Sequence, residues 1–354
     1  MADLGRTFEQ AGSADSDARR WTGSTPIGRM TTVLVSGASG IVGYGILRSL
    51  RMCAQPVRLI GASIYDDSVA PAFCDVFELA PRTDAANYVE WLTGVITRHG
   101  IDLIVPGIEI DLYKWIDHVP EITRAGATPL LNNLALIRLC QDKWHFYMDL
   151  RQAGLPNAIE SSLDTDFDAL VVGFGLPFLL KPRRGFASKG IVRVHDRETF
   201  EAHSAGIGPL LMAQPLIGSD DAEFTAAAFG DGRGSFSAVM TLKRRLSRDG
   251  FTDRAEVVSS DEFVGAISAL CQRFAPEGPT NFQFRRSPDG VKLLEINPRI
   301  SSSTAIRAAF GYNESAMALA YFLERRLPAQ PAIRPGRAVR FTDEYIFYDD
   351  RIHL

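Results

Sequence analysis

The sequence predicts an α/β lobe with a parallel sheet, followed by an α+β part with antiparallel strands. Two observations lead to this fold class. Up to about residue 127, patterns of buried strands alternate with helical patterns, which indicates a parallel sheet covered by helices on both faces. Beyond that point, neighbouring strand patterns are joined by short glycine turns at 230–232 and 289–290, and such turns favour antiparallel pairs.

The N-terminal part of the chain divides into a tail and a first lobe. Residues 1–28 are rich in Ala, Gly, Ser, Asp and Arg and show little periodicity, so we expect a mobile tail. The first lobe occupies residues 29–127 and is expected to be Rossmann-like. Its expected strands are 31–36, 57–61 and 101–105, and its expected helices are 44–52 and 88–99.

The second part, residues 128–350, begins with a long helical pattern at 134–153. Gly154 and Pro156 follow this pattern and are typical of a helix end. Short strand patterns come next, and Pro182 stops the first of them before a loop rich in glycine and basic residues. The expected strands of this part are 178–181, 191–194, 210–214, 223–229, 235–241, 281–285 and 291–296.

Composition argues against several classes of protein. The formal net charge is −4, which gives no reason to expect nucleic acid or an anionic membrane as a partner. The cysteines are scattered, as in a reducing cytoplasm, and the histidines lack the spacing of zinc ligands. No segment is long and apolar enough to span a bilayer, and the N-terminus lacks the pattern of a secretory signal. We therefore expect a cytoplasmic protein.

The strongest chemical signal is an expected hairpin that runs from Asn281 to Arg299. Side chains alternate between the faces of a strand, so Glu295 and Asn297 share one face, and Gln283 can join them from the other strand. Three side-chain oxygens would then converge, which suits a hard cation such as Mg²⁺. Arg299 follows Pro298 and can reach a phosphate. The alternative is a surface hairpin with a polar, solvated face.

This segment strongly resembles the ATP-grasp superfamily, especially one synthetase unit of the carbamoyl-phosphate synthetase large subunit. In that family a Gln or Glu on one strand and Glu-x-Asn-Pro-Arg on the next bind metals and triphosphate, and here Gln283, Glu295, Asn297 and Arg299 match. The resemblance covers roughly residues 31–350. It implies the ATP-grasp fold, with a Rossmann-like N-terminal lobe, a small lid lobe and a C-terminal lobe. It also implies ATP and Mg²⁺ as cofactors, with Mn²⁺ as an alternative metal.

The same resemblance implies the residues that hold the triphosphate. Lys143 and Lys181 match the two lysines of the family that touch nucleotide phosphates, which need positive charge around them. Residues 183–190 resemble the family's glycine-containing lid, with Ser188 and Lys189 as added donors. Solvated surface lysines and an ordinary basic turn are the alternatives.

The resemblance also implies a site for the nucleoside. Gln214, Pro215 and Leu216 lie where the family has the hinge that meets adenine, although the family usually has Glu in place of Gln214. Glu223 matches a carboxylate that accepts the ribose hydroxyls, and a carboxylate is a natural acceptor for a diol. A charge at a strand edge is the alternative reading of Glu223.

Three further residues are candidates for the acceptor side. Arg244 lies where related enzymes have a basic residue near the γ-phosphate or the substrate carboxylate, and a solvated basic turn is equally compatible with it. Glu109 follows the end of an expected strand, where open α/β sheets place ligands, so it is either a substrate contact or an exposed loop acid. Arg307 is expected to face the acceptor as well.

The glycines at positions 37, 40 and 43 favour a second interpretation. This spacing after a strand also resembles short-chain dehydrogenases, and Asp66 or Asp67 lies where a ribose-binding carboxylate would sit. The Tyr-x-x-x-Lys pair of those dehydrogenases is absent from the sequence, however. We expect the loop to support the acceptor site rather than a dinucleotide.

Taken together, the sequence predicts a carboxylate–amine ligase. We expect the carboxylate to attack the γ-phosphate of ATP, an acyl phosphate to form, and an amine to displace phosphate. The expected partners are a small carboxylate and an amine, and a homodimer is left open. An ATP-grasp kinase is the alternative, and an NAD(P)-dependent oxidoreductase and a non-catalytic nucleotide-binding module are less favoured. One grasp unit without a glutaminase domain argues against carbamoyl-phosphate synthesis itself.

Overall fold

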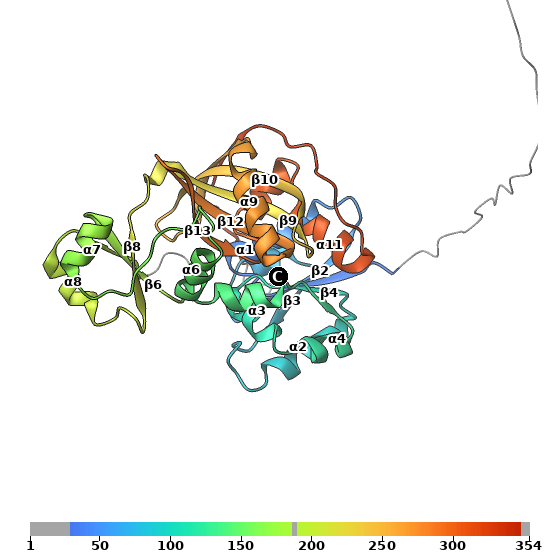
Figure 1. Ribbon diagram of the computed structural model, residues 1–354. Coiled ribbons are helices and arrows are strands. Elements are labelled where there is room, and N and C mark those ends of the chain that lie inside the picture. The colour runs from blue at the N-terminus through green and yellow to red at the C-terminus, as the bar shows by residue number, and fades with distance from the viewer. Residues whose placement is uncertain (1–28, 186–189, 348–354) are drawn as a thin grey trace, which may run out of the picture. The chain divides into compact units, whose positions relative to one another are not determined.

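The computed structural model describes residues 29–185 and 190–347, and from Thr31 onward these residues belong to one structural unit. Three sheets organise this described part (Figure 1). The first is a parallel sheet with the strand order β3-β2-β1-β4-β5, in agreement with the predicted Rossmann-like lobe. Its strands are β1 (Thr31–Val35), β2 (Val57–Ser63), β3 (Val76–Leu79), β4 (Leu103–Val105) and β5 (Thr128–Pro129).

Helices pack against both faces of this sheet, because buried side chains of its strands alternate between two apolar clusters. Val33 and Val35 pack with α1, whereas Leu34 packs with α2 and α4. The helices of this lobe are α1 (Ile41–Arg51), the 3₁₀ helix η1 (Ala70–Phe73), α2 (Tyr88–His99), α3 (Glu109–Trp115) and α4 (Val119–Ala125). The predicted helix at 88–99 is confirmed, and Glu109 begins α3 instead of lying in a loop.

The helix predicted at 134–153 is wrong as a single element. Two helices, α5 (Leu134–Cys140) and α6 (Lys143–Gln152), replace it. Asp142 separates them, because its carboxylate accepts hydrogen bonds from the backbone N–H groups of Trp144 and His145 and so caps the start of α6. This cap places Lys143 in the first turn of a new helix.

A small lobe follows, built on the antiparallel sheet β7-β6-β8. Phe178 and Leu180 of β6 pack with Leu170 and Phe200, so both helices of the lobe share one core with the sheet, and Figure 1 shows them beside β6 and β8. The elements are α7 (Phe167–Phe174), β6 (Phe178–Pro182), β7 (Val192–Val194), α8 (Arg197–Ser204) and β8 (Leu211–Pro215).

The third sheet is antiparallel, with the order β13-β12-β9-β10-β11-β14. Phe263 and Ile267 of α9 cover one face, and Tyr312 and Met317 lie against the other. Its strands are β9 (Glu223–Asp231), β10 (Phe236–Leu246), β11 (Thr252–Val258), β12 (Glu277–Ser287), β13 (Gly290–Asn297) and β14 (Arg337–Val339). The remaining elements are η2 (Asp220–Ala222), α9 (Asp261–Phe274), α10 (Thr304–Ala309) and α11 (Glu314–Glu324).

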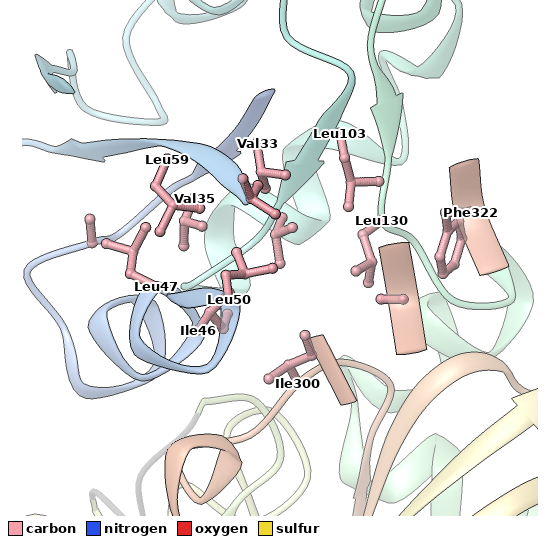
Figure 2. Packing of buried hydrophobic residues seen from close by; sticks show 14 of the residues in the cluster. Val33, Val35, Ile46, Leu47, Leu50, Leu59, Leu103, Leu130, Ile300 and Phe322 are labelled. Carbon is pink, nitrogen blue, oxygen red and sulfur yellow. The ribbon is translucent and has the colours of Figure 1, made fainter. Parts of the chain in front are cut away.

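The core of the first lobe includes residues from the C-terminal part of the chain. Ile300, just after β13, and Phe322, on α11, pack in one cluster with strands β1, β2 and β4 and helix α1, as Figure 2 shows. Each is almost fully buried, and burying a side chain of this size stabilises by about 1.5–3 kcal/mol. The segment that follows β13 is therefore held against the first lobe.

Candidate active site

A cavity of about 660 Å³ lies among the first lobe, the small lobe and the six-stranded sheet. Most of the predicted site residues line it. They are Glu109, Lys143, Lys181, Gln214, Leu216, Glu223, Arg244, Gln283, Glu295, Asn297 and Arg299. Residues that are far apart in the sequence thus line one cavity.

The hairpin β12–β13 places its polar side chains as expected from strand alternation. Gln283 and Glu295 are paired residues of neighbouring strands. The Asn297 amide donates a hydrogen bond from Nδ2 to Glu295 Oε1 over 3.0 Å, and its Oδ1 accepts one from Arg299 Nη2 over 3.2 Å. Pro298 ends the ladder, so Arg299 leaves the sheet and turns toward the first lobe. The hairpin thus forms a continuous polar strip along one side of the cavity.

Two lysines lie near Glu295. Burial alone would raise the pKa of the Glu295 carboxyl, but Lys143 and Lys181 hold it below its usual range. In the reverse direction, desolvation in the cleft lowers the pKa of Lys181 to about 8, although Glu295 opposes this shift. The Lys143 ammonium donates to the Gly185 carbonyl over 2.7 Å, which ties the start of α6 to the loop after β6. Glu295 is therefore ionised at neutral pH.

The side chains of Glu295, Asn297 and Gln283 are suited to a cation that is also bound by phosphate oxygens. Within 29–185 and 190–347, no group of three or more His, Cys, Asp or Glu side chains is placed to hold a metal alone. Glu295 contributes one carboxylate and Asn297 and Gln283 contribute amide oxygens, all of which are hard ligands. Because Mg²⁺ in proteins is usually bound by one or two carboxylates together with substrate phosphates, the donor set fits Mg²⁺ bound to a nucleotide.

Glu223 lies in a row of charged residues across three strands. Arg244 on β10 and Arg285 on β12 are both in register with it. Arg244 Nη2 donates to Glu223 Oε1 over 2.8 Å, and Arg285 Nη2 donates to Glu223 Oε2 over 2.7 Å. Arg244 Nη2 also donates to Gln283 Oε1 over 2.7 Å. The expected ribose acceptor is thus a buried carboxylate between two guanidinium groups, and its contact with ribose stays a prediction.

Arg299 and Glu109 join two lobes across the cavity. Arg299 Nη2 donates to Glu109 Oε1 over 2.6 Å, and both side chains are largely buried. Glu109 begins α3 in the first lobe, whereas Arg299 follows β13 of the third sheet. Glu109 therefore lies at the cavity as expected, with its carboxylate on the arginine that the hairpin presents.

Arg307 does not lie where the sequence suggested. Its side chain is 0% exposed and does not line the cavity. It donates to Ser301, Thr225 and Asn281 and pairs with Glu314 over 3.2 Å. The predicted direct contact of Arg307 with substrate is therefore wrong. The reason is that α10 turns this side chain into the core, where it holds the loop after β13.

The residues predicted to form a nucleoside hinge lie only partly in the cavity lining. Gln214 and Leu216 line the cavity, whereas Pro215 ends β8 and is not part of the lining. Gln214 Nε2 donates to Ser161 Oγ over 3.0 Å, so this amide is anchored within the small lobe. Ser188 and Lys189, expected in the lid, lie outside the described residues.

The glycines near the start of α1 have a packing role. A Cβ on Gly43 would lie 2.2 Å from the Gly37 carbonyl oxygen, and one on Gly107 would lie 2.1 Å from the Ser36 carbonyl oxygen. These contacts let the loops after β1 and β4 approach closely. The spacing that resembles a dinucleotide loop is thus explained by contact between backbones.

Sequence reasoning missed several residues in the cavity lining or next to it. Arg285 is two positions after Gln283 on the same strand, so alternation alone could have placed it on the same face. Arg183 binds the Asp142 carboxylate over 2.9 Å and so holds the end of β6 to the start of α6. No local sequence pattern predicts this ion pair. The apolar lining residues Ile110 and Phe251 also carried no signal of their own.

Comparisons with known protein sequences agree with this geometry. Residues 222–344 match the family described as ATP-grasp in the biosynthetic pathway with Ter operon. A D-alanine–D-alanine ligase from Cupriavidus pinatubonensis is 41% identical over 194 residues, which are 54% of this chain and 51% of the ligase. The carbamoyl phosphate synthase large chain of Thermomicrobium roseum is 26% identical over 199 residues, 52% of this chain and 18% of the synthase. The chain therefore matches at most about half of these curated relatives.

Solved structures share the fold at low identity. N5-carboxyaminoimidazole synthetase from Staphylococcus aureus superposes with a TM-score of 0.66 and 16% identity, over 86% of this chain and 80% of that one. The biotin carboxylase domain of the Hydrogenobacter thermophilus 2-oxoglutarate carboxylase, solved with MgADP and bicarbonate, gives a TM-score of 0.66 and 16% identity, over 88% and 74%. Among the described helices, none is long and apolar enough to cross a membrane.

Proposed function

This chain is an ATP-grasp protein, and from that premise we propose that it is an ATP-dependent carboxylate–amine ligase that works through an acyl phosphate. The observation that carries the proposal is the single cavity in which Lys143, Lys181 and the strip Glu295–Asn297–Arg299 meet the loops of the first lobe. A triphosphate needs positive charge along its length, and the acceptor must reach its last phosphate. Both needs are met in one space.

The residues of the chain divide the work of the first step. Lys143 and Lys181 neutralise phosphate charge, and Glu295, with Asn297 and Gln283, would hold Mg²⁺, which supplies further charge neutralisation when bound. Arg299 positions the acceptor carboxylate beside the γ-phosphorus. An oxygen of this carboxylate forms a bond to phosphorus while the bond to the bridging oxygen of ADP breaks, and the electron pair leaves with ADP.

The second step needs little from the protein beyond position. The amine nitrogen attacks the acyl carbon, the carbon–oxygen bond to phosphate breaks, and inorganic phosphate leaves with the electron pair while the amine loses a proton. A carboxylate acceptor is ionised at neutral pH and requires no general base in the first step. Positioning and electrostatic stabilisation therefore account for most of the catalysis.

An assay with hydroxylamine tests the proposal. The protein is incubated with Mg-ATP, hydroxylamine and a panel of carboxylic acids, and hydroxamate, ADP and phosphate are measured. We expect one acid to yield hydroxamate with equal amounts of ADP and phosphate. Formation of AMP and pyrophosphate would contradict the mechanism. A stable phosphorylated alcohol, with no hydroxamate from any acid, would favour the kinase alternative.

A further inference from the structure

One end of the cavity has a composition that limits the acceptor. This acceptor end is formed by residues 40–42 and 107–113 of the first lobe, the turn 246–251 between β10 and β11, and residues 298–302 after β13. The turn is held against the last of these segments, because Thr252 Oγ1 and Ser303 Oγ share a hydrogen bond of 2.9 Å. Four separate segments therefore enclose this end.

The lining of the acceptor end is mostly apolar. Leu112, Tyr113 and Pro298 contribute to it, and six further apolar side chains are Ile41, Val42, Ile108, Ile110, Leu246 and Phe251. None of these six is buried as a core residue is, and Ile110 is 51% exposed. An apolar ligand that covers such water-exposed apolar surface is held there by the hydrophobic effect.

Charge at this end is sparse: Arg299 and Glu109 form an ion pair at the polar strip, and Asp249 on the turn 246–251 adds a further carboxylate. Among the described lining residues of this end, the cations are Arg299 and the neighbouring Arg244, paired with Glu109 and Glu223 respectively. Both guanidinium groups lie at the polar strip, where Arg299 also contacts Asn297. One anionic group can therefore be held beside the proposed phosphate site, whereas a second anionic group would face apolar side chains and the Asp249 carboxylate.

Resting on the proposed ligase function, we propose that the acceptor is a carboxylic acid with a branched aliphatic or aromatic body. Its carboxylate faces Arg299 and its body covers the side chains of Ile110, Leu246 and Phe251. Bicarbonate would leave these side chains in water, and a dicarboxylate or a sugar phosphate would bring a charged group onto them. The acceptor end therefore selects by apolar area and against a second charge.

Competition among acids tests this assignment. Hydroxamate formation is measured with leucine, phenylalanine, 4-methylpentanoate and 3-phenylpropanoate, against acetate and succinate, and bicarbonate-dependent ADP release is measured in parallel. We expect at least one apolar acid to exceed acetate in kcat/KM by about 100-fold, since each buried methylene is worth roughly tenfold or more. Preferred turnover of acetate, succinate or bicarbonate would overturn the inference and leave the ligase function standing.

Variants at Ile110 connect this preference to the cavity. Ile110→Asn should lower kcat/KM for the preferred apolar acid by about tenfold through KM and for acetate by much less, and ADP should still bind. Ile110→Phe, which narrows the space, should move the preference toward the smaller apolar acids. Val172→Asn is the matched control, because Val172 is 89% exposed on α7 and outside the lining.

The two proposals fail in different ways. If both Ile110 variants bind ADP like the parent protein and keep its acid preference, the inference is wrong and the ligase function is unaffected. If the parent protein binds ADP and no acid yields hydroxamate or ADP release, the ligase function itself is wrong and the acceptor assignment falls with it. ADP-induced thermal stabilisation of each protein shows which case applies.

Discussion

The two ends of the cavity are built from different kinds of structure. At the end proposed to bind ATP, the phosphate end, Glu223, Arg244, Arg285 and Glu295 project from neighbouring strands of one sheet, in a register set by paired backbones. At the acceptor end, the lining comes from loops and the first turns of helices. The contrast indicates that side-chain positions are fixed at the phosphate end and can vary at the acceptor end. Strand register fixes the positions of the charged side chains, whereas loops tolerate changes of side chain, and such changes would alter the proposed acceptor.

The largest effect is expected at the phosphate end. Glu295→Gln removes the carboxylate that interacts with Lys143 and Lys181, and with it the charge proposed to hold a cation. We expect kcat to fall by about 1,000-fold or more, which corresponds to about 4 kcal/mol at the transition state. Initial rates of ADP formation measure it. Glu201→Gln, on the exposed surface of α8, is the control, and a Glu295→Gln protein with near-normal kcat would contradict the role given to the hairpin.

The contrast between the two ends also explains what the sequence could predict. Glu295 and Asn297 are two residues apart on one strand, and their common face follows from the geometry of any strand. The parallel sheet followed from alternating patterns for a similar reason. In both cases the spacing of apolar and polar residues along the sequence is enough to predict the structure.

Features that depend on tertiary contacts were not predictable in this way. The break at Asp142 was missed because apolar spacing continues through it, and only the cap and the ion pair with Arg183 reveal it. Arg307 was misassigned because α10 is short and its direction is set by packing against β9 and β12. Alternation could place Arg285 on the face of Gln283, but its pairing with Glu223 depends on the register between β9 and β12.

The second prediction concerns the loop that joins the two ends. Arg307→Met leaves the Glu314 carboxyl buried without its charge partner, and burial already raises the pKa of that carboxyl. Removal of one partner of a buried pair typically lowers the free energy of unfolding by about 3–5 kcal/mol. Chemical denaturation measures the loss. The double variant with Glu314→Gln should recover part of it, and an unchanged midpoint for Arg307→Met would contradict a structural role.

The third prediction uses the lowered pKa of Lys181, about 8 in the free protein. Below this pH the side chain is an ammonium group and attracts phosphate, and above it the charge is lost. ADP binding measured with EDTA should therefore weaken as pH rises through 8, by at most about tenfold per pH unit. Lys181→Arg should remove this dependence, because a guanidinium stays charged. Lys243→Arg, at an exposed position on β10, is the control, and an unchanged slope in Lys181→Arg would refute the assignment.

The smallest effect is expected where the two ends meet, at the ion pair of Arg299 with Glu109. Glu109→Gln keeps a hydrogen-bond acceptor at this position and removes its charge, so Arg299 stays near its place and becomes more available to an acceptor carboxylate. Two consequences oppose each other. The acid no longer competes with the Glu109 carboxylate for Arg299, but the Arg299 guanidinium is held less firmly in place. We expect KM for the acid to change by about threefold to tenfold, or roughly 0.7–1.4 kcal/mol, with ADP binding unchanged.

Steady-state kinetics with the acid varied at saturating ATP measure the change. Asp66→Asn, a carboxylate of the first lobe outside the cavity lining, is the matched control. A parallel loss of ADP affinity in Glu109→Gln would show that this pair serves the phosphate end and would remove the boundary drawn between the two ends.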